Sequence, residues 1–500
     1  METTTMPLLK GAPPTTLTLL ENGNYAPARS FEEAKSMFWI ETVKIWKIAG
    51  PISFQIICQY RTNSFTNIFV VHIGNFELSS VTISLIVIGT FSFGFMLGMG
   101  SALETLCGQA FGGGQIHSLG AYMQRSWIIL LATCFILLPF YIFATPILKL
   151  LGQEVEIADM AGKFTILTIP QLFSLAITFP TVKFLRAQSK VNLLAWIGFL
   201  ALILHIGILW LFINVLCWGT TGAAIAFDIT SWEISLAQVA YVIFWCNERW
   251  HGFSWLAFKE IWAFVRLSIA SAVMLCLEIW YMMSMILLVG HLNNAVIALG
   301  SLSICMNLNG WEAMQFIGIN AAMSVRVSNE LGLGHPRAAK YSEYVNLLQS
   351  LLIGLFRMVV VVITRDHFAI IFISREEMQR AVAHLAYLLG VTMVLNSVQP
   401  VISGVAIDGG WQTLVAITFL IFRFGYLLGY KAKLGVMGLW EGMISGTALQ
   451  TLLLLIVLYG TNWDKEVEQT MGRMRKWGGQ EIATEGTNSS RWQTGLSRQT

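Results

Sequence analysis

One carboxyl group stands alone in a long apolar stretch of this sequence. Glu278 lies within MLCLEIWYMM, and no Lys, Arg, Asp or Glu occurs between Arg266 and Glu312 except Glu278 itself. At ~1.5 Å per helical residue, Glu278 lies ~18 Å from Arg266, near the middle of a bilayer. Burial there favours the protonated acid, so Glu278 is suited to bind and release protons near neutral pH. The alternative is a structural carboxylic acid bonded to a neighbouring helix.

Other ionisable residues lie inside or at the ends of apolar stretches. Glu312 is flanked by Asn309 and Trp311, which suits either the wall of a cation-binding cavity or a hydrogen bond between helices. Asp228 and Glu233 share one stretch, where we expect interhelical bonding. Three further residues stand at the ends of apolar stretches and predict ion pairs or gate contacts rather than substrate binding: Glu104, Arg326 and Glu330.

Several kinds of chemistry are missing from the sequence. There is no GxxxxGK[ST] loop for nucleotide phosphates, no GxSxG, and no pair of histidines three or four residues apart. The seven cysteines form no metal-ligand or disulfide pattern, and the net charge of +3 offers no nucleic-acid-binding stripe. We therefore expect no enzyme activity, no nucleotide or nucleic-acid partner, no metal site and no cofactor other than a coupling ion.

The elements that carry these residues are predicted to be membrane helices. Hydrophobic residues make up 55% of the 500 residues and charged residues 12%, about half the usual share. A helix needs ~20 apolar residues to cross a bilayer, and continuous apolar stretches favour helices over a barrel. We predict twelve spans: 40–70, 78–106, 121–145, 157–182, 191–214, 220–246, 260–289, 296–325, 340–364, 378–403, 410–428 and 436–460.

The distribution of Lys and Arg indicates the orientation in the membrane. With cytosolic termini, the inner loops carry ten of these residues and the outer loops six, so we predict that both termini are cytosolic. Residues 462–477 form a potential amphipathic helix with its basic residues towards lipid headgroups.

The two halves of the chain resemble each other. His72 and His291 lie 219 residues apart, Pro180 and Pro400 lie 220 apart, and the glycine pair 219/222 recurs as 435/438, shifted by 216. These offsets predict a tandem duplication of six helices, with a pseudo-two-fold axis along the membrane normal and a cavity between two lobes; chance matching of Gly and Pro is the alternative. The predicted organisation is a cytosolic tail (1–37), a six-helix lobe (38–246), a cytosolic linker (247–259), a second six-helix lobe (260–460) and a cytosolic tail (461–500).

Six motifs stand out along the chain: GMGSALETLCGQAFGGGQ (98–115), YMQRSW (122–127), VMLCLEIWY (273–281), AAMSVRVSNELGLGHPRAAK (321–340), LNSVQPVISGVA (395–406) and GLWEGMISGTALQT (438–451). Together they resemble the multidrug and toxic compound extrusion (MATE) transporters, in particular their plant detoxification branch. The resemblance implies a V-shaped all-α body of two lobes. It also implies exchange of protons for small organic solutes such as flavonoids, alkaloids or xenobiotics, with sodium as the less expected coupling ion. It implies a monomer in the lipid bilayer of the vacuole or the plasma membrane.

The resemblance also assigns roles to individual residues. Glu278 matches the family's coupling carboxylate in helix seven, Asn396 takes the place of a frequent Asp in helix ten, and Asn67 lies near the place of an Asp in helix one of bacterial relatives. The candidate cavity residues are Gln59, Asn67, Tyr281, Asn309, Trp311, Glu312, Asn396, Gln399 and Pro400.

Span eleven departs from the family pattern. Between GGWQTLVA and GYLLGYKAKLGV the sequence has only ITFLIFRF (417–424), which leaves Arg423 mid-span, and Asp408 replaces a usual Gly. A non-transporting membrane scaffold is therefore the alternative function. A major facilitator is disfavoured because that family's Arg-bearing loop after span two is replaced by GQAFGGGQIHSLG.

Overall fold

The computed structural model is a bundle of long helices. It describes residues 20–21, 24–25, 30–246, 250, 252–258, 261–262, 264–266, 268–269, 271–273, 275–276, 295–371, 376–408 and 435–478. The α-helices are α2 (Phe31–Val71), α3 (Asn75–Ile83), α4 (Thr90–Met99), α5 (Ser101–Gly112), α6 (Ser118–Ile142), α7 (Ala144–Leu150), α8 (Val155–Leu167), α9 (Ile169–Ala187), α10 (Val191–Leu209), α11 (Gly219–Trp245), α13 (Ala295–Gly332), α14 (Pro336–Ile363), α15 (Glu376–Asp408), α17 (Gly435–Gly460) and α18 (Trp463–Gly478). The short elements are strands β1 (Leu20–Glu21) and β2 (Asn24–Tyr25), π-helices η1 (Ser84–Gly89) and η2 (Trp210–Val215), and 3₁₀ turns η3 (Trp255–Phe258) and η4 (Phe368–Ile371).

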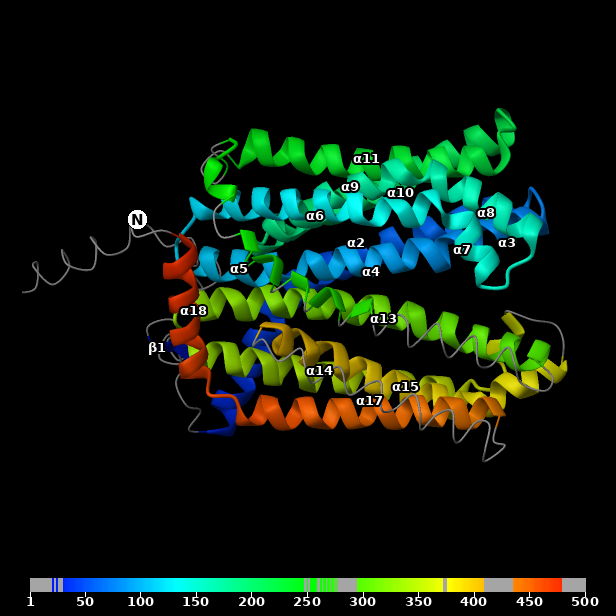
Figure 1. Cartoon of the computed structure of the whole chain (residues 1–500). Coiled ribbons are helices and arrows are strands. Elements are labelled where there is room, and N and C mark those ends of the chain that lie inside the picture. The colour runs from blue at the N-terminus through cyan, green and yellow to red at the C-terminus, as the bar shows by residue number, and fades with distance from the viewer. Residues whose placement is uncertain are drawn as a thin grey trace, which may run out of the picture.

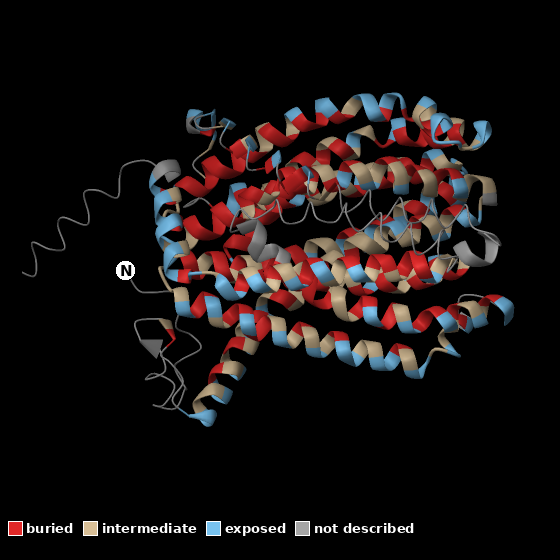
Figure 2. Ribbon diagram, turned by 60° about the horizontal axis from the view of Figure 1, so that its bottom comes forward, coloured by how far each residue is buried: buried red, intermediate tan, exposed pale blue. Residues whose placement is uncertain are grey.

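The helices form two lobes that lie side by side (Figure 1). The first lobe contains α2 to α11 and the second contains α13 to α17, while α18 crosses one end of the bundle. The lobes meet where α13 packs against α2 and α5. Figure 2 shows buried residues along the packed faces of the helices and exposed residues along the outer ones, as expected for a body surrounded by lipid.

The helices agree with most of the predicted spans. Among the described residues, six helices are long and apolar enough to cross a membrane, and the pair α8 and α9, bent by 47°, would make a seventh. Helix α2 begins seven residues before the predicted start of the first lobe, at Phe31. Most of the predicted span 260–289 and all of span 410–428, including the shortened segment 417–424, lie outside the described residues.

Helix α2 is much longer than a bilayer is thick. Its 41 residues extend about 60 Å, against ~30 Å of hydrocarbon. The helix begins with a capping box, because the Ser30 side chain accepts a hydrogen bond from the backbone N–H of Glu33 at 3.2 Å. The first turns of α2 therefore project beyond the membrane at the end of the bundle where α18 lies, which we call the terminal end (Figure 1).

Backbone conformation supports the predicted duplication. Gly219 and Gly435 open the last helix of each lobe, α11 and α17, and their φ angles are 59° and 60°. A left-handed φ favours glycine, so the same residue is required at the same point of both halves. Pro180 and Pro400 likewise both lie inside helices, α9 and α15.

The lobes approach closely at the terminal end through glycines. A Cβ added at Gly112 on α5 would clash with the backbone of Asn329 on α13, and one added at Gly332 on α13 would clash with the carbonyl of Gln109. Only hydrogen at these positions lets the two backbones touch. The terminal end is therefore closed by direct packing of one lobe on the other.

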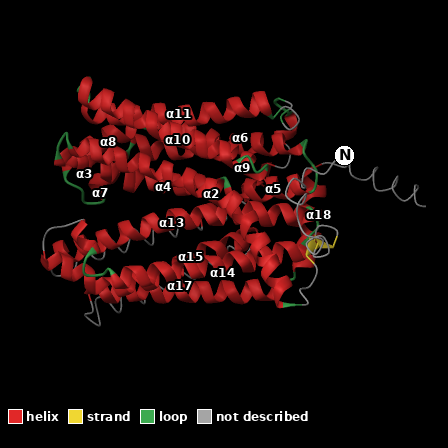
Figure 3. Cartoon of the chain, turned by 180° about the vertical axis from the view of Figure 1, so that it is seen from behind, coloured by secondary structure: helices red, strands yellow, loops and turns green. Residues whose placement is uncertain are grey.

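Helix α18 confirms the predicted C-terminal helix, and the orientation of its basic residues towards lipid headgroups stays a prediction. It packs against α5 of the first lobe and α13 and α14 of the second, and Figure 3 shows it across the end of both. Trp463 and Met474 are buried, and Met474 lies against Gly113. Trp463 and Met474 are thus covered by protein, because α18 bridges the two lobes.

We expect Gly112→Ala to open the terminal end. The added methyl group overpacks the contact with Asn329, which costs roughly 1–3 kcal/mol, or about 5- to 150-fold in the ratio of closed to open molecules. Double electron–electron resonance between spin labels on K190C and L333C, in a C217S background, should show a longer distance between the labels in Gly112→Ala than in wild type. Gly207→Ala is the matched control, since nothing lies within 4 Å of its added Cβ. Identical distances in Gly112→Ala and wild type would contradict the expectation.

Candidate functional site

A buried ion pair lies halfway along α13. Glu312 is 4% exposed, and its carboxylate lies 3.5 Å from the guanidinium of Arg357 on α14. Arg357 also donates a hydrogen bond to the side chain of Gln315. In the described part of the chain neither carboxylate oxygen of Glu312 has a hydrogen bond. Among the described residues, its charge is therefore paired with that of Arg357.

Helix α2 brings a second cation to the same level. The guanidinium of Arg61 lies 4.4 Å from the centroid of the Trp311 ring, a cation–π contact between the two lobes. The Tyr60 hydroxyl lies close to Gly310. Trp311 is 43% exposed, so its ring remains accessible for a flat or cationic solute.

Helix α15 completes the polar cluster. The Asn396 amide donates to the Asn309 side-chain oxygen at 3.0 Å. Pro400 has no N–H, so the carbonyl of Asn396 one turn earlier loses its helical donor and remains an acceptor beside the cluster. Gln399 is buried nearby on the same helix. We define the central cluster as Arg61, Asn309, Trp311, Glu312, Arg357 and Asn396.

The structure thus unites some of the predicted cavity residues and leaves others apart. Gln59 and Asn67 are half-buried on α2, and Asn67 has a buried side-chain oxygen that accepts no hydrogen bond within the described residues. Glu278 and Tyr281 lie outside the described residues, so their roles stay predictions. Among the described residues, no group of three or more His, Cys, Asp or Glu side chains could hold a metal.

The first lobe contains a buried polar group that the sequence analysis missed. His205 on α10 lies between two threonines, with its Nε2 2.9 Å from Thr66 Oγ1 and its Nδ1 2.8 Å from Thr230 Oγ1. A single polar residue within ALILHIGIL was the available signal. The interhelical bond expected of Asp228 is present, because its carboxylate accepts from the backbone N–H of Gln171 at 3.0 Å.

The terminal end contains a buried charge network between the lobes. Arg326 on α13 donates to Glu41 on α2 at 2.9 Å and also pairs with Glu330, as the i,i+4 spacing predicted. Tyr25 from the N-terminal hairpin and Ser342 from α14 both donate to Glu41. Glu41 was missed, since nothing in the sequence marks a partner 285 residues away.

The third predicted inner-end residue lies within one lobe. Glu104 on α5 forms a 3.5 Å ion pair with Lys183 on α9. This contact fits the ion-pair role that was expected of it. A gate role for Glu104, Arg326 or Glu330 stays a prediction.

Groups of this network beyond the predicted spans have shifted pKa values. Burial would raise the pKa of Glu330, but hydrogen bonds and charge from His335 and Arg326 hold it below its ordinary value. Burial and the neighbouring Glu41 carboxylate raise the pKa of the Tyr25 hydroxyl far above its ordinary value. At neutral pH the network therefore holds an ionised Glu330 and a protonated Tyr25.

Comparison with known proteins agrees with this architecture. The family model MatE matches the chain twice, from 51 to 211 and from 270 to 430, a shift of 219 residues at both ends. That shift confirms the duplication predicted from the histidine and proline offsets.

Related proteins cover almost the whole chain. Protein DETOXIFICATION 35 of Arabidopsis thaliana is 71% identical over 467 residues, 92% of this chain and 96% of the relative. Protein DETOXIFICATION 34 of the same plant is 63% identical over 91% of this chain and 85% of the relative. The crystal structure of the eukaryotic MATE transporter AtDTX14 superposes with a TM-score of 0.83 at 30% identity, covering 87% of this chain and 99% of that one.

We expect Arg326→Leu to destabilise the protein strongly. Glu41 and Glu330 would both lose the guanidinium that they share while staying buried, which costs about 3–5 kcal/mol. Equilibrium unfolding with SDS in mild detergent measures the loss. Arg380→Leu is the matched control, because its ion pair with Glu376 is largely exposed and should contribute at most about 1 kcal/mol. Equal losses in the two variants would contradict a buried network.

The Glu330 contribution should depend on pH in a defined direction. Because its folded pKa is lowered from 4.5, its stabilisation is complete above that value and is lost as the pH falls below it. We expect the difference in Tm between wild type and Glu330→Gln to shrink as the pH falls from about 5 towards about 3.5. A difference that grows on acidification would show the opposite pKa shift.

Proposed function

The chain belongs to the MatE family of transporters, and we propose that it is a proton-coupled antiporter that moves amphipathic organic compounds out of the cytosol. Flavonoids, alkaloids or xenobiotics are the proposed solutes, and the vacuole or the cell exterior is the proposed destination. A multi-pass membrane transporter of the MATE type is what its relatives and apolar helices support directly.

The central cluster carries the proposal about solutes. It combines an accessible aromatic ring, Trp311, with amides of Asn309 and Asn396 and the buried pair of Glu312 and Arg357. A site with a flat apolar surface and a few polar groups suits amphipathic ring compounds. Its contact between Arg61 on α2 and Trp311 on α13 joins the two lobes, which suits a solute that is exposed alternately to the two sides.

We assign proton coupling to Glu278 rather than Glu312. Protonating Glu312 would leave Arg357 buried without its carboxylate partner, which is unfavourable. Glu278 has no oppositely charged residue in its own apolar stretch between Arg266 and Glu312. A proton on Glu278 would change its hydrogen bonding and bias the lobes towards one opening, and its loss would favour the other.

The closed terminal end gives a direction to the cycle. The excess of Lys and Arg predicts that this end faces the cytosol. The contacts of Gly112 and Gly332 and the pair of Arg326 and Glu41 then correspond to a cytosolic gate in its closed state. Substrate release would occur from this arrangement, and substrate loading after the lobes separate there.

We expect Glu278→Gln to abolish uptake of a fluorescent organic cation driven by a pH gradient in proteoliposomes. The amide cannot exchange a proton, so the gradient no longer does work, whereas exchange of labelled for unlabelled solute should survive because it needs no net proton movement. Glu233→Gln on α11 is the control and should transport like wild type. Full gradient-driven uptake by Glu278→Gln would show that Glu278 is not the coupling residue. Wild-type uptake that depends on a sodium gradient instead of a pH gradient would show that sodium is the coupling ion.

A further inference from the structure

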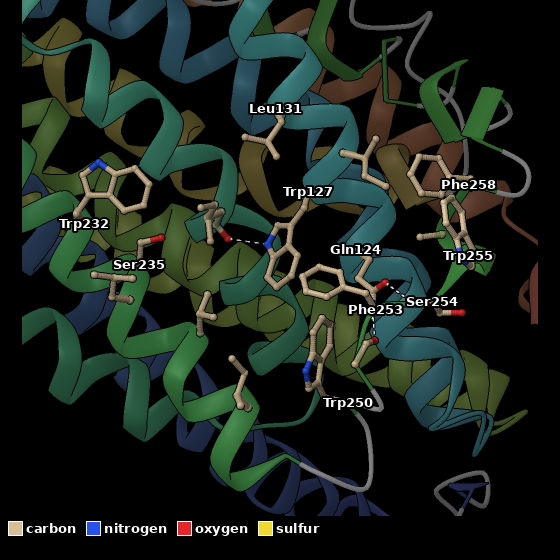
Figure 4. Close-up of a pocket in the computed structure, with 17 residues that line it drawn as sticks. Gln124, Trp127, Leu131, Trp232, Ser235, Trp250, Phe253, Ser254, Trp255 and Phe258 are labelled. Carbon is tan, nitrogen blue, oxygen red and sulfur yellow. Dashed lines mark hydrogen bonds between the residues drawn. The ribbon is translucent and has the colours of Figure 1, made fainter.

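A cavity lies on the outer side of the first lobe, away from the central cluster. Its volume is about 750 Å³, within the range of small-molecule sites. Helices α6, α9 and α11 form its walls, and residues 250 and 252–258 of the linker between the lobes close one end (Figure 4).

Six of the 17 lining residues are aromatic. Four tryptophans face the cavity at positions 127, 232, 250 and 255, together with Phe253 and Phe258. Trp127 and Trp250 contact each other edge to face, with ring centroids 5.6 Å apart. Such rings offer flat faces and edges to a planar aromatic guest.

The linker is fixed in place by helix α6. The side chain of Gln124 donates to the Gly252 carbonyl at 2.6 Å and accepts from the Ser254 backbone N–H at 2.9 Å (Figure 4). The guanidinium of Arg125 donates to the Ala257 carbonyl at 3.3 Å. These bonds make the linker a formed wall rather than a loose covering.

One polar group in the lining lacks a partner. Ser235 on α11 is 1% exposed, and its hydroxyl has no hydrogen bond to any described residue. Figure 4 shows it on the cavity wall near Trp232, opposite Trp127. It lies ten residues, or about 15 Å, before the end of α11 at Trp245, deep in the membrane. A buried hydroxyl without a partner is unfavourable, and a ligand oxygen would supply the missing hydrogen bond.

The composition of the lining restricts the ligand. None of its 17 residues is ionisable, so a charged molecule would lose its hydration without compensation. A lipid chain would fill the apolar space but would leave the Ser235 hydroxyl unpaired. Exposed side chains on α11, including Leu236 and Phe244, indicate that this flank faces lipid, so entry from the bilayer is open to uncharged molecules.

We propose that this cavity binds a flat, uncharged aromatic molecule whose hydroxyl or carbonyl oxygen bonds the Ser235 hydroxyl. The site is separate from the central cluster, because its walls are α6, α9, α11 and the linker rather than α13 to α15. Binding at this site does not depend on whether the protein transports a solute.

The test compares two probes that differ by a single hydroxyl group. Pyren-1-ol and pyrene are titrated into purified protein in lipid nanodiscs, and binding is measured by energy transfer from tryptophan. We expect pyren-1-ol to bind about three- to tenfold more tightly than pyrene, as one hydrogen bond between uncharged groups predicts.

Variants locate the binding. Ser235→Ala should abolish the preference for pyren-1-ol, and Val239→Trp should weaken both probes by filling the cavity. Ser350→Ala is the matched control, because Ser350 on α14 is equally buried and its hydroxyl also lacks a hydrogen bond within the described residues. Equal affinity for both probes in wild type, or an unchanged preference in Ser235→Ala, would overturn the proposal in favour of a cavity filled by lipid chains. Since Ser235→Ala keeps the wall intact, the test survives if Val239→Trp fails to fold.

Discussion

The direct contact of the two lobes at the terminal end determines the rest of the structure. Gly112 and Gly332 let α5 and α13 touch through their backbones, and Arg326 joins α13 to Glu41 of α2 beside this contact. Helix α18 then covers the same end from outside by packing on both lobes. The lobes are held together here. A molecule can therefore reach the central cluster from this side only after the glycine contacts between α5 and α13 and the ion pair of Arg326 with Glu41 have both broken.

The two halves share a backbone plan but carry different polar groups. The glycines that open α11 and α17 have the same left-handed conformation, and a single family model matches both halves. Inside the first lobe, for example, His205 lies buried between two threonines, whereas the second lobe has Glu312 paired with Arg357. A duplicated scaffold thus fixes where the helices lie, and later substitutions decide which polar groups each half buries.

The sequence predicted features that depend on local composition. Span positions, the offset between halves, the Arg326 and Glu330 pair and an interhelical bond of Asp228 follow from apolar length, periodicity and the expense of a lone charge in lipid. It did not predict that Glu41 meets Arg326 or that Arg61 lies over Trp311, because each contact joins residues far apart in the chain and depends on how the lobes dock. Nor did it predict that α18 packs on both lobes, because an apolar face can be covered by protein as well as by lipid.

A buried ion pair is well suited to a contact that must break. In a dry interface the attraction between Arg326 and Glu41 is strong, but most of it replaces hydration that both charges lost on burial. If the lobes separate and water enters, both groups regain that hydration, so the net free energy of opening is far smaller than the attraction suggests. Removing only one partner is different, because the remaining charge is then left in the closed interface without water or a counter-charge. The pair therefore makes the closed state specific without making it permanent, as alternating exposure of a central site requires.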